Sequence, residues 1–170
     1  MIRHIVLISQ GPNDIGFMEG LRDRLGCDAQ IIDYRNDPLL RRKGAQTRPK
    51  DARFIINRYL RNVDLFIRLT DGDETRPCEV AREERMRFPE SVHSMFVCGV
   101  CDRDVEAWLA LDAPYLAKTL SFDPVVLPLD REARSAFIKN RIRRALPPDQ
   151  TYTAFVANFV RQAPKDVIKQ

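Results

Sequence analysis

The chain has 170 residues, of which 44% are apolar and 31% charged, and its formal net charge is +4 at pH 7. This composition is typical of a globular protein with one buried core, and it excludes a disordered chain. The four cysteines are too few for a disulfide scaffold in a chain of this length. The apolar run in residues 1–8 is too short for a signal peptide or a membrane span. The sequence therefore predicts a cytoplasmic protein with no membrane partner.

Strand-like and helix-like segments alternate along the chain. Apolar, β-branched and aromatic runs predict strands over residues 2–8, 29–34, 63–69 and 92–100. Helical periodicity predicts helices over residues 13–25, 51–61, 78–88, 102–111 (after a turn), 114–120, 130–146 and 152–161. This alternation predicts an α/β fold with a doubly wound, mainly parallel, four-stranded, Rossmann-like sheet in residues 1–120. Residues 121–170 are predicted to form a helical extension packed on the same domain.

Polar turns follow three of the predicted strands. They are Gln10–Asp14, Asp71–Asp73 and Asp104–Glu106. Because ligands of parallel sheets bind beyond the carboxyl ends of the strands, we expect these turns to meet at one edge. The carboxylates would then form a cluster suited to one or two Mg²⁺ ions; they are Asp14, Asp71, Asp73 and Glu106. The alternative for Asp71-Gly72-Asp73 is an exposed turn without a ligand, in which glycine supplies backbone freedom.

The segment before the third predicted strand is strongly basic. Between Arg41 and Arg61 the only acidic residue is Asp51. Such a run predicts contacts with a phosphate backbone, and a solvated surface loop is the alternative. The residues expected to position phosphates are Arg41, Arg42, Lys43, Arg48 and Lys50.

Two cysteines, Cys98 and Cys101, lie three residues apart in the fourth predicted strand. Together with Cys78 and His93 they could be drawn as a zinc site. Residues three apart in a strand point to opposite faces, however, so two buried structural thiols are the favoured interpretation.

The order of the polar turns resembles TOPRIM domains. Ile8–Asp14 resembles their V-E-G-x-T-D turn, and Leu69–Asp73 resembles their D-x-D motif. Val105–Asp112 is similar to the I-E-A-W-L-L-A-D segment of an uncharacterised TOPRIM-like bacterial family that is linked to mobile and defence loci. That family also has a Lys-Gly step, matched by Lys43-Gly44. The resemblance covers residues 1–120.

The resemblance implies metal-dependent phosphoryl chemistry on nucleic acid, on DNA more than on RNA. Asp71 and Asp73 would hold Mg²⁺ (or Mn²⁺), and Asp14 and Glu106 would complete a second metal site, as in the nuclease branch. An ATPase partner is implied by the family context. One position departs from the pattern: Gln10 replaces the glutamate of the first motif, and an amide cannot take up a proton at neutral pH.

Two functions remain open. The first is a Mg²⁺-dependent nuclease, with Gln10, Asp14, Asp71, Asp73 and Glu106 as the catalytic set. The second is a catalytically impaired TOPRIM relative that binds nucleic acid or docks a partner. A primase-like nucleotidyl transferase also stays open, whereas a receiver-type phosphoacceptor domain lacks the acidic residues it needs after the first strand. The sequence does not determine the oligomeric state, and a homo-oligomer is one of the open alternatives.

Overall fold

A four-stranded parallel sheet organises the computed structural model, which describes residues 2–36, 49–72, 76–101 and 104–164. The strands are β1 (His4–Ile8), β2 (Gln30–Asp33), β3 (Leu65–Asp71) and β4 (Phe96–Cys101), in the spatial order β2-β1-β3-β4. All neighbouring pairs run parallel. The prediction of an α/β fold with a four-stranded parallel sheet is therefore confirmed, and the arrangement is compatible with a Rossmann-like fold.

Several strand boundaries differ from the sequence prediction, and the start of β4 and the end of β3 differ in ways that bear on the site. β4 begins at Phe96 rather than at Val92, because Glu90–Met95 form a 3-10 helix after Pro89. A short apolar run does not by itself distinguish a strand from a helical turn, and Val92 is buried in that turn. β3 extends to Asp71 because it stays paired with β4 up to Cys101. Asp71 is therefore the end of a strand rather than the start of a turn.

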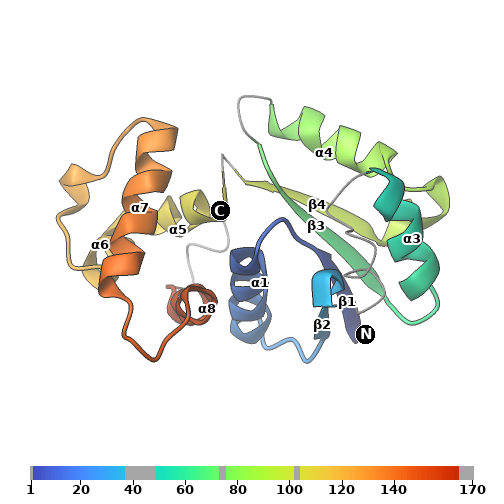
Figure 1. Ribbon diagram of the computed structural model, residues 1–170, viewed down its shortest axis with the longest axis horizontal. Coiled ribbons are helices and arrows are strands. Elements are labelled where there is room, and N and C mark those ends of the chain that lie inside the picture. Colours follow the sequence, from blue (N-terminus) through green and yellow to red (C-terminus); the bar gives the residue numbers. More distant parts are fainter. Residues whose placement is uncertain (1, 37–48, 73–75, 102–103, 165–170) are drawn as a thin grey trace.

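Helices cover both faces of the sheet (Figure 1). α3 (Pro49–Tyr59) and α4 (Pro77–Met86) lie on one face, and α1 (Pro12–Arg24) lies on the other. Beyond the carboxyl end of β4 the chain forms α5 (Val105–Leu109), α6 (Ala113–Thr119) and α7 (Arg131–Ala145), and α8 (Tyr152–Gln162) then lies beside α1. Pro77 begins α4, and Gly26 follows α1 with φ +62°.

Side chains of the strands alternate between two cores, because successive residues of a strand point to opposite faces. Val6 and Phe66 pack with Ile55 of α3. Leu7 packs with Met18 of α1. The strands are apolar on both sides because helices cover both faces, as the sequence predicted.

A buried ion pair interrupts the apolar core on the α3–α4 face. Arg68 of β3 is 3% exposed, and its Nε donates a hydrogen bond of 3.1 Å to Glu84 Oε2 of α4. Its Nη1 donates a second bond of 3.2 Å to the carbonyl oxygen of Ile8. Arg87 also pairs with Glu84. The buried charges are therefore compensated locally.

Two glycines of α1 allow α8 to approach very closely. A Cβ atom at Gly16 would overlap the carbonyl oxygen of Thr153, and one at Gly20 would overlap that of Ala157. Leu25, the C-cap of α1, takes no part in this packing, because it is 64% exposed. The glycine face of α1 is instead the one that packs on α8. This contact attaches the C-terminal helix to the sheet domain.

A third core lies among the helices beyond the sheet. Ile138 and Ile142 of α7, Leu116 of α6 and Val156 of α8 are fully buried there. In the part of the chain that the structure describes, no helix combines the length and apolar character needed to cross a membrane.

Candidate functional site at the carboxyl edge of the sheet

The side chain of Gln10 joins the carboxyl ends of β1 and β3. Its Nε2 donates a hydrogen bond of 3.1 Å to Thr70 Oγ1, and its Oε1 accepts one of 3.3 Å from the backbone N–H of Asp71. The strand order reverses between β1 and β3, and ligands of open α/β sheets bind at such a switch point. Gln10 therefore lies where the fold favours a ligand site, with both ends of its amide hydrogen-bonded.

Asp14 lies in the first turn of α1 and is 8% exposed. Its Oδ2 accepts hydrogen bonds from the backbone N–H groups of Gln10, at 2.7 Å, and of Gly11, at 3.0 Å. The N-cap of α1 is Gly11, so the helix begins one residue earlier than the predicted residue 13. An acidic side chain three residues after the N-cap can bond back to the orphan N–H groups of the helix start, which is what Asp14 does.

Gly72 follows Asp71 and lies against the end of β4. Its N–H donates a hydrogen bond of 2.8 Å to the carbonyl oxygen of Cys101. A Cβ atom at Gly72 would lie 2.7 Å from the same oxygen. Among the described glycines only Gly26 has a positive φ. The expectation that Gly72 is needed for its backbone freedom is therefore corrected: the close approach of β4 excludes a side chain there.

Glu106 of α5 is almost completely buried, at 2% exposure. Its Oε1 accepts hydrogen bonds of 2.9 Å from Asn13 Nδ2 of α1 and of 2.9 Å from the Tyr152 hydroxyl of α8. Its Oε2 lies 3.8 Å from Lys139 Nζ of α7. Burial raises the pKa of the Glu106 carboxyl, and burial together with the Glu106 charge raises the pKa of Tyr152. Glu106 therefore links the sheet edge to three helices.

Asp104 is the N-cap of α5 and binds two side chains of α7. Lys139 Nζ donates a hydrogen bond of 2.7 Å to Asp104 Oδ2, and Ser135 Oγ donates to the same oxygen. Burial acts against the charged form of Asp104, but the hydrogen bonds from Lys139 and Ser135 outweigh it and lower the pKa. Burial likewise acts against the charge of Lys139, but the Asp104 hydrogen bond and the nearby carboxylate charges raise its pKa.

The thiol of Cys101 is buried at the end of β4, and its pKa responds to several acidic side chains. Burial raises its pKa first, and the negative charges of Asp14, Asp71, Asp104 and Glu106 raise it further. These carboxylates follow β1, β3 and β4 in the sequence. Asp14, Asp71, Asp104 and Glu106 therefore all act on the Cys101 side of β4, but their assembly into one metal-binding cluster stays a prediction.

A Mg²⁺ ion at this edge stays a prediction, and the protein ligands available for one are few. The Gln10 backbone N–H bonds to the Asp14 carboxylate, and the Gln10 side chain bonds to the backbone N–H of Asp71. The adjacent Ser9 hydroxyl is fully buried and has no hydrogen-bond partner among the described residues. Within the described ranges, no three His, Cys, Asp or Glu side chains are arranged to hold a metal by themselves. Mg²⁺ usually takes only one or two carboxylates from the protein and completes its coordination with water or substrate phosphates. Asp14 and Asp71 are the described carboxylates proposed for that role.

Some predicted site residues lie outside the described part of the chain. Asp73 falls in residues 73–75, and Lys50 lies in α3 with a side chain that the structure does not describe. The other phosphate-binding candidates fall in residues 37–48; they are Arg41, Arg42, Lys43 and Arg48. Contact of this basic segment with nucleic acid stays a prediction.

Sequence reasoning missed the contribution of the C-terminal helices to this edge. Lys139 and Tyr152 lie in the helices predicted over residues 130–146 and 152–161, and the sequence predicted no role for either at the site. No local pattern separates Lys139 from the arginines of the same helix, because its partners lie on α5. One indication for Tyr152 was present in the sequence: a tyrosine hydroxyl that becomes buried needs a hydrogen-bond partner.

The cysteines do not form the zinc set that could be drawn from the sequence. All four are free thiols, and Cys78 is exposed. Burial raises the pKa of Cys98 to about 11, and the Glu84 charge on the α4 side raises it further. Cys101 instead experiences the carboxylates at the opposite face. The favoured interpretation, structural thiols on opposite faces of β4, agrees with this arrangement.

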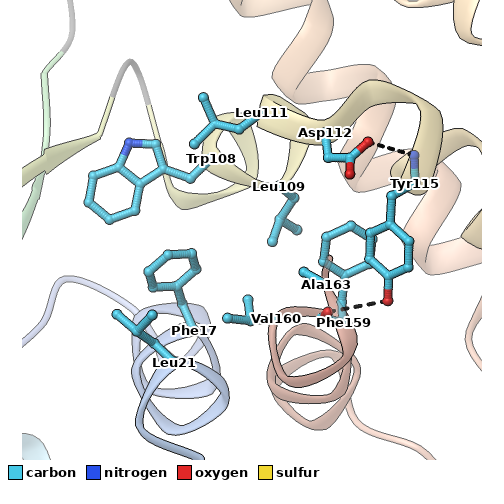
Figure 2. Close-up of a pocket in the computed structure, with 10 residues that line it drawn as sticks. All are labelled: Phe17, Leu21, Trp108, Leu109, Leu111, Asp112, Tyr115, Phe159, Val160 and Ala163. Carbon is cyan, nitrogen blue, oxygen red and sulfur yellow. Dashed lines mark hydrogen bonds between the residues drawn. The ribbon is translucent and has the colours of Figure 1, made fainter. Parts of the chain in front are cut away.

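A separate cavity of about 260 Å³ lies between α1, α8 and the α5–α6 segment (Figure 2). Aromatic pairs border its two ends: Phe17 and Trp108, with ring centroids 5.1 Å apart, and Tyr115 and Phe159, 4.7 Å apart. The Tyr115 N–H donates a bond of 2.9 Å to Asp112 Oδ1, and the Tyr115 hydroxyl donates one of 3.4 Å to the Phe159 carbonyl. The polar groups of this cavity thus serve the ends of α6 and α8, and the remaining lining offers apolar contact.

The chain was compared with protein-family models, with curated proteins and with solved structures, and none of them matches it. The resemblance to TOPRIM domains therefore depends on the sequence motifs. What the structure adds is the α/β fold and the arrangement of the site.

Proposed function

We propose that the carboxyl edge of the sheet carries out TOPRIM-type, Mg²⁺-dependent phosphoryl transfer, namely the hydrolysis of phosphodiester bonds in nucleic acid. The substrate would be DNA rather than RNA. Mn²⁺ would support the reaction as well as Mg²⁺, and the reaction would take place in the cytoplasm. The observation that supports the proposal is that Gln10, at the switch point of a parallel sheet, bonds to the Asp14 carboxylate and to the backbone of Asp71.

Each residue of the site has a role in this proposal. Asp14 and Asp71 would bind the ion, with Asp73 as the next carboxylate along the chain. When bound, the ion would supply positive charge to the phosphoryl oxygens and a more acidic water molecule. Gln10 would hold the ends of β1 and β3 at a constant separation through its bonds to Thr70 and to Asp71. The basic segment in residues 41–50 would neutralise the phosphate backbone.

Two observations favour a second candidate, a TOPRIM relative with impaired catalysis that binds nucleic acid or docks a partner such as an ATPase. The Gln10 amide replaces an acid, and both of its ends are already hydrogen-bonded. Glu106 is surrounded by donors of this chain, namely Asn13, Tyr152 and Lys139. Either feature would lower activity, because general acid–base chemistry and metal binding both need available carboxylate oxygens.

Cleavage assays on plasmid, single-stranded DNA and RNA, with Mg²⁺ or Mn²⁺, test the first candidate. Asp71→Asn keeps the size of the side chain and removes its charge, so we expect it to reduce cleavage at least about a hundredfold, the usual range for loss of a group that stabilises developing charge. Asp149→Asn is the matched control, because Asp149 is exposed in the loop between α7 and α8. We expect the control to cleave like the wild-type protein.

The binding of labelled DNA at increasing salt concentration tests the second candidate. Salt-sensitive binding without cleavage by the wild-type protein would favour the impaired relative. If the protein neither cleaves nor binds nucleic acid, the nuclease and the nucleic-acid-binding form of the second candidate are both wrong, and only the docking of a partner is left. If Asp71→Asn and Asp149→Asn lose cleavage equally, the activity does not come from the carboxyl edge.

A further inference from the structure

The ammonium group of Lys139 lies between two carboxylates at the carboxyl edge of the sheet. Its Nζ is 2.7 Å from Asp104 Oδ2 and 3.8 Å from Glu106 Oε2. The carboxylate side chains are 13% and 2% exposed, respectively, whereas that of Lys139 is 35% exposed. Lys139 reaches them from α7, more than thirty residues further along the chain. The contact is therefore made by the tertiary fold, not by neighbours in the sequence.

Two carboxylates held this close repel each other unless a positive charge lies between them. A divalent ion and a fixed ammonium group can both provide that charge. We propose that Lys139 is a built-in cation that occupies the place of a second divalent ion, so that the site binds one metal ion and not two. The proposal rests on the proposed function for the first ion, which Asp14 and Asp71 would hold.

The remaining contacts of Glu106 agree with an internal cation. Its other oxygen, Oε1, accepts hydrogen bonds from two neutral donors, Asn13 and Tyr152. A divalent ion bound by Glu106 would have to displace Lys139 or one of these donors from a side chain that is almost completely buried. The ammonium group needs no such rearrangement, because it already satisfies Asp104 and lies close to Glu106.

The number of bound Mn²⁺ ions, measured by electron paramagnetic resonance during titration of the full chain, tests the proposal. We expect one ion for the wild-type protein and two for Lys139→Met, which removes the charge but keeps the apolar stem. The additional ion should disappear in the double variant Lys139→Met/Glu106→Gln. Lys139→Arg retains a cation and is the matched control, for which we expect one ion.

The possible results distinguish this proposal from the proposed function. If the folded Lys139→Met variant gains no ion, the proposal is wrong, and the first metal site is unaffected. If the wild-type protein binds two ions and Glu106→Gln removes one, the proposal is also wrong. If the wild-type protein binds none and Lys139→Met gains one that depends on Glu106, the role of Lys139 stands and the metal site at Asp14 and Asp71 is contradicted.

Loss of the ion pair is itself expected to destabilise the protein, so the stability of Lys139→Met provides a second measurement. If Lys139 stands in for a metal ion, Mn²⁺ should raise the melting temperature of Lys139→Met more than that of the wild-type protein. A purely structural lysine would give the same Mn²⁺ effect in both proteins, and that result would overturn the proposal. If Lys139→Met does not fold even with Mn²⁺, the wild-type protein tests the proposal. One bound ion that is retained in Glu106→Gln supports it, and two ions of which Glu106→Gln removes one contradict it.

Discussion

Gln10 and Thr70 lie sixty positions apart in the sequence and are joined by a hydrogen bond of 3.1 Å between Gln10 Nε2 and Thr70 Oγ1. The bond spans the point at which the strand order of the sheet reverses. Because the other end of the amide accepts from the Asp71 N–H, the side chain that replaces an acid of the TOPRIM pattern also holds two strand ends together. Gln10 thus contributes to the fold as well as to the candidate site.

Gln10→Glu should strengthen Mg²⁺ binding. The new carboxylate can still accept from the Asp71 N–H, and it adds negative charge beside Asp71 and Asp14. We expect a gain in affinity of roughly tenfold, or about 1.4 kcal/mol, measured by calorimetric titration. Gln30→Glu makes the same change at the amino end of the sheet, where Gln30 pairs with His4, and should leave the affinity unchanged. An unchanged affinity in Gln10→Glu would count against a metal site next to this residue.

Gly16→Ala should destabilise the protein, because the added methyl group would overlap the Thr153 carbonyl and push α8 away from α1. We expect a loss of about 1–3 kcal/mol in the free energy of unfolding, measured with urea. Gly11→Ala is the matched control, since nothing lies within 4 Å of its Cβ position, and it should cost less than about 1 kcal/mol. Equal losses in the two variants would contradict the close packing of α1 and α8.

Glu84→Gln should also be strongly destabilising, because it leaves the charge of the buried Arg68 without its partner. Breaking a buried pair in this way costs about 3–5 kcal/mol. Replacing both residues, as in Arg68→Met/Glu84→Leu, should recover most of this loss, since no buried charge is left unpaired and Arg87, which loses its contact with Glu84, is 38% exposed to solvent. Glu83→Gln, at an exposed neighbouring position on α4, is the control and should change little. Urea unfolding of the four proteins measures these differences, and a double variant as unstable as Glu84→Gln would contradict the pairing.

Asp64 makes a contribution to stability that depends on pH. Its Oδ2 accepts hydrogen bonds from the backbone N–H groups of Arg3, at 2.7 Å, and His4, at 2.9 Å, and these lower its pKa below the ordinary value of 3.8. A lowered folded-state pKa gives stability that is present above the unfolded-state value and is lost as the pH falls through the folded-state value. Asp64→Asn should therefore be less stable than the wild-type protein at neutral pH, and the difference should shrink in acid below 3.8.

Urea unfolding at neutral and at acidic pH checks this prediction. Asp28→Asn changes another exposed acid near the amino end of β2 and serves as the control. A difference between Asp64→Asn and the wild-type protein that stays constant with pH would show that the charge of Asp64 does not contribute.

Much of the fold was predictable because its signals are local. The apolar run of β1 and the proline at the start of α4 depend only on adjacent residues, and the structure confirms both elements. The start of β4 was placed four residues early, at Val92 rather than Phe96, because burial in a 3-10 turn and burial in a strand favour the same residue types. The role of Gly72 was misjudged for a related reason: close approach by Cys101 leaves no trace in the neighbouring sequence.

The sequence by itself determined the α/β class, the parallel sheet and the carboxyl edge at which its polar turns lie, because hydrophobic period and strand–helix alternation specify these features. Only the tertiary structure decided which groups neutralise that edge. Lys139 and Tyr152 reach Glu106 from α7 and α8, and α8 is placed by its packing on the glycine face of α1. Such contacts depend on how helices pack against one another, and packing is decided by shape across the whole fold and not by any local pattern.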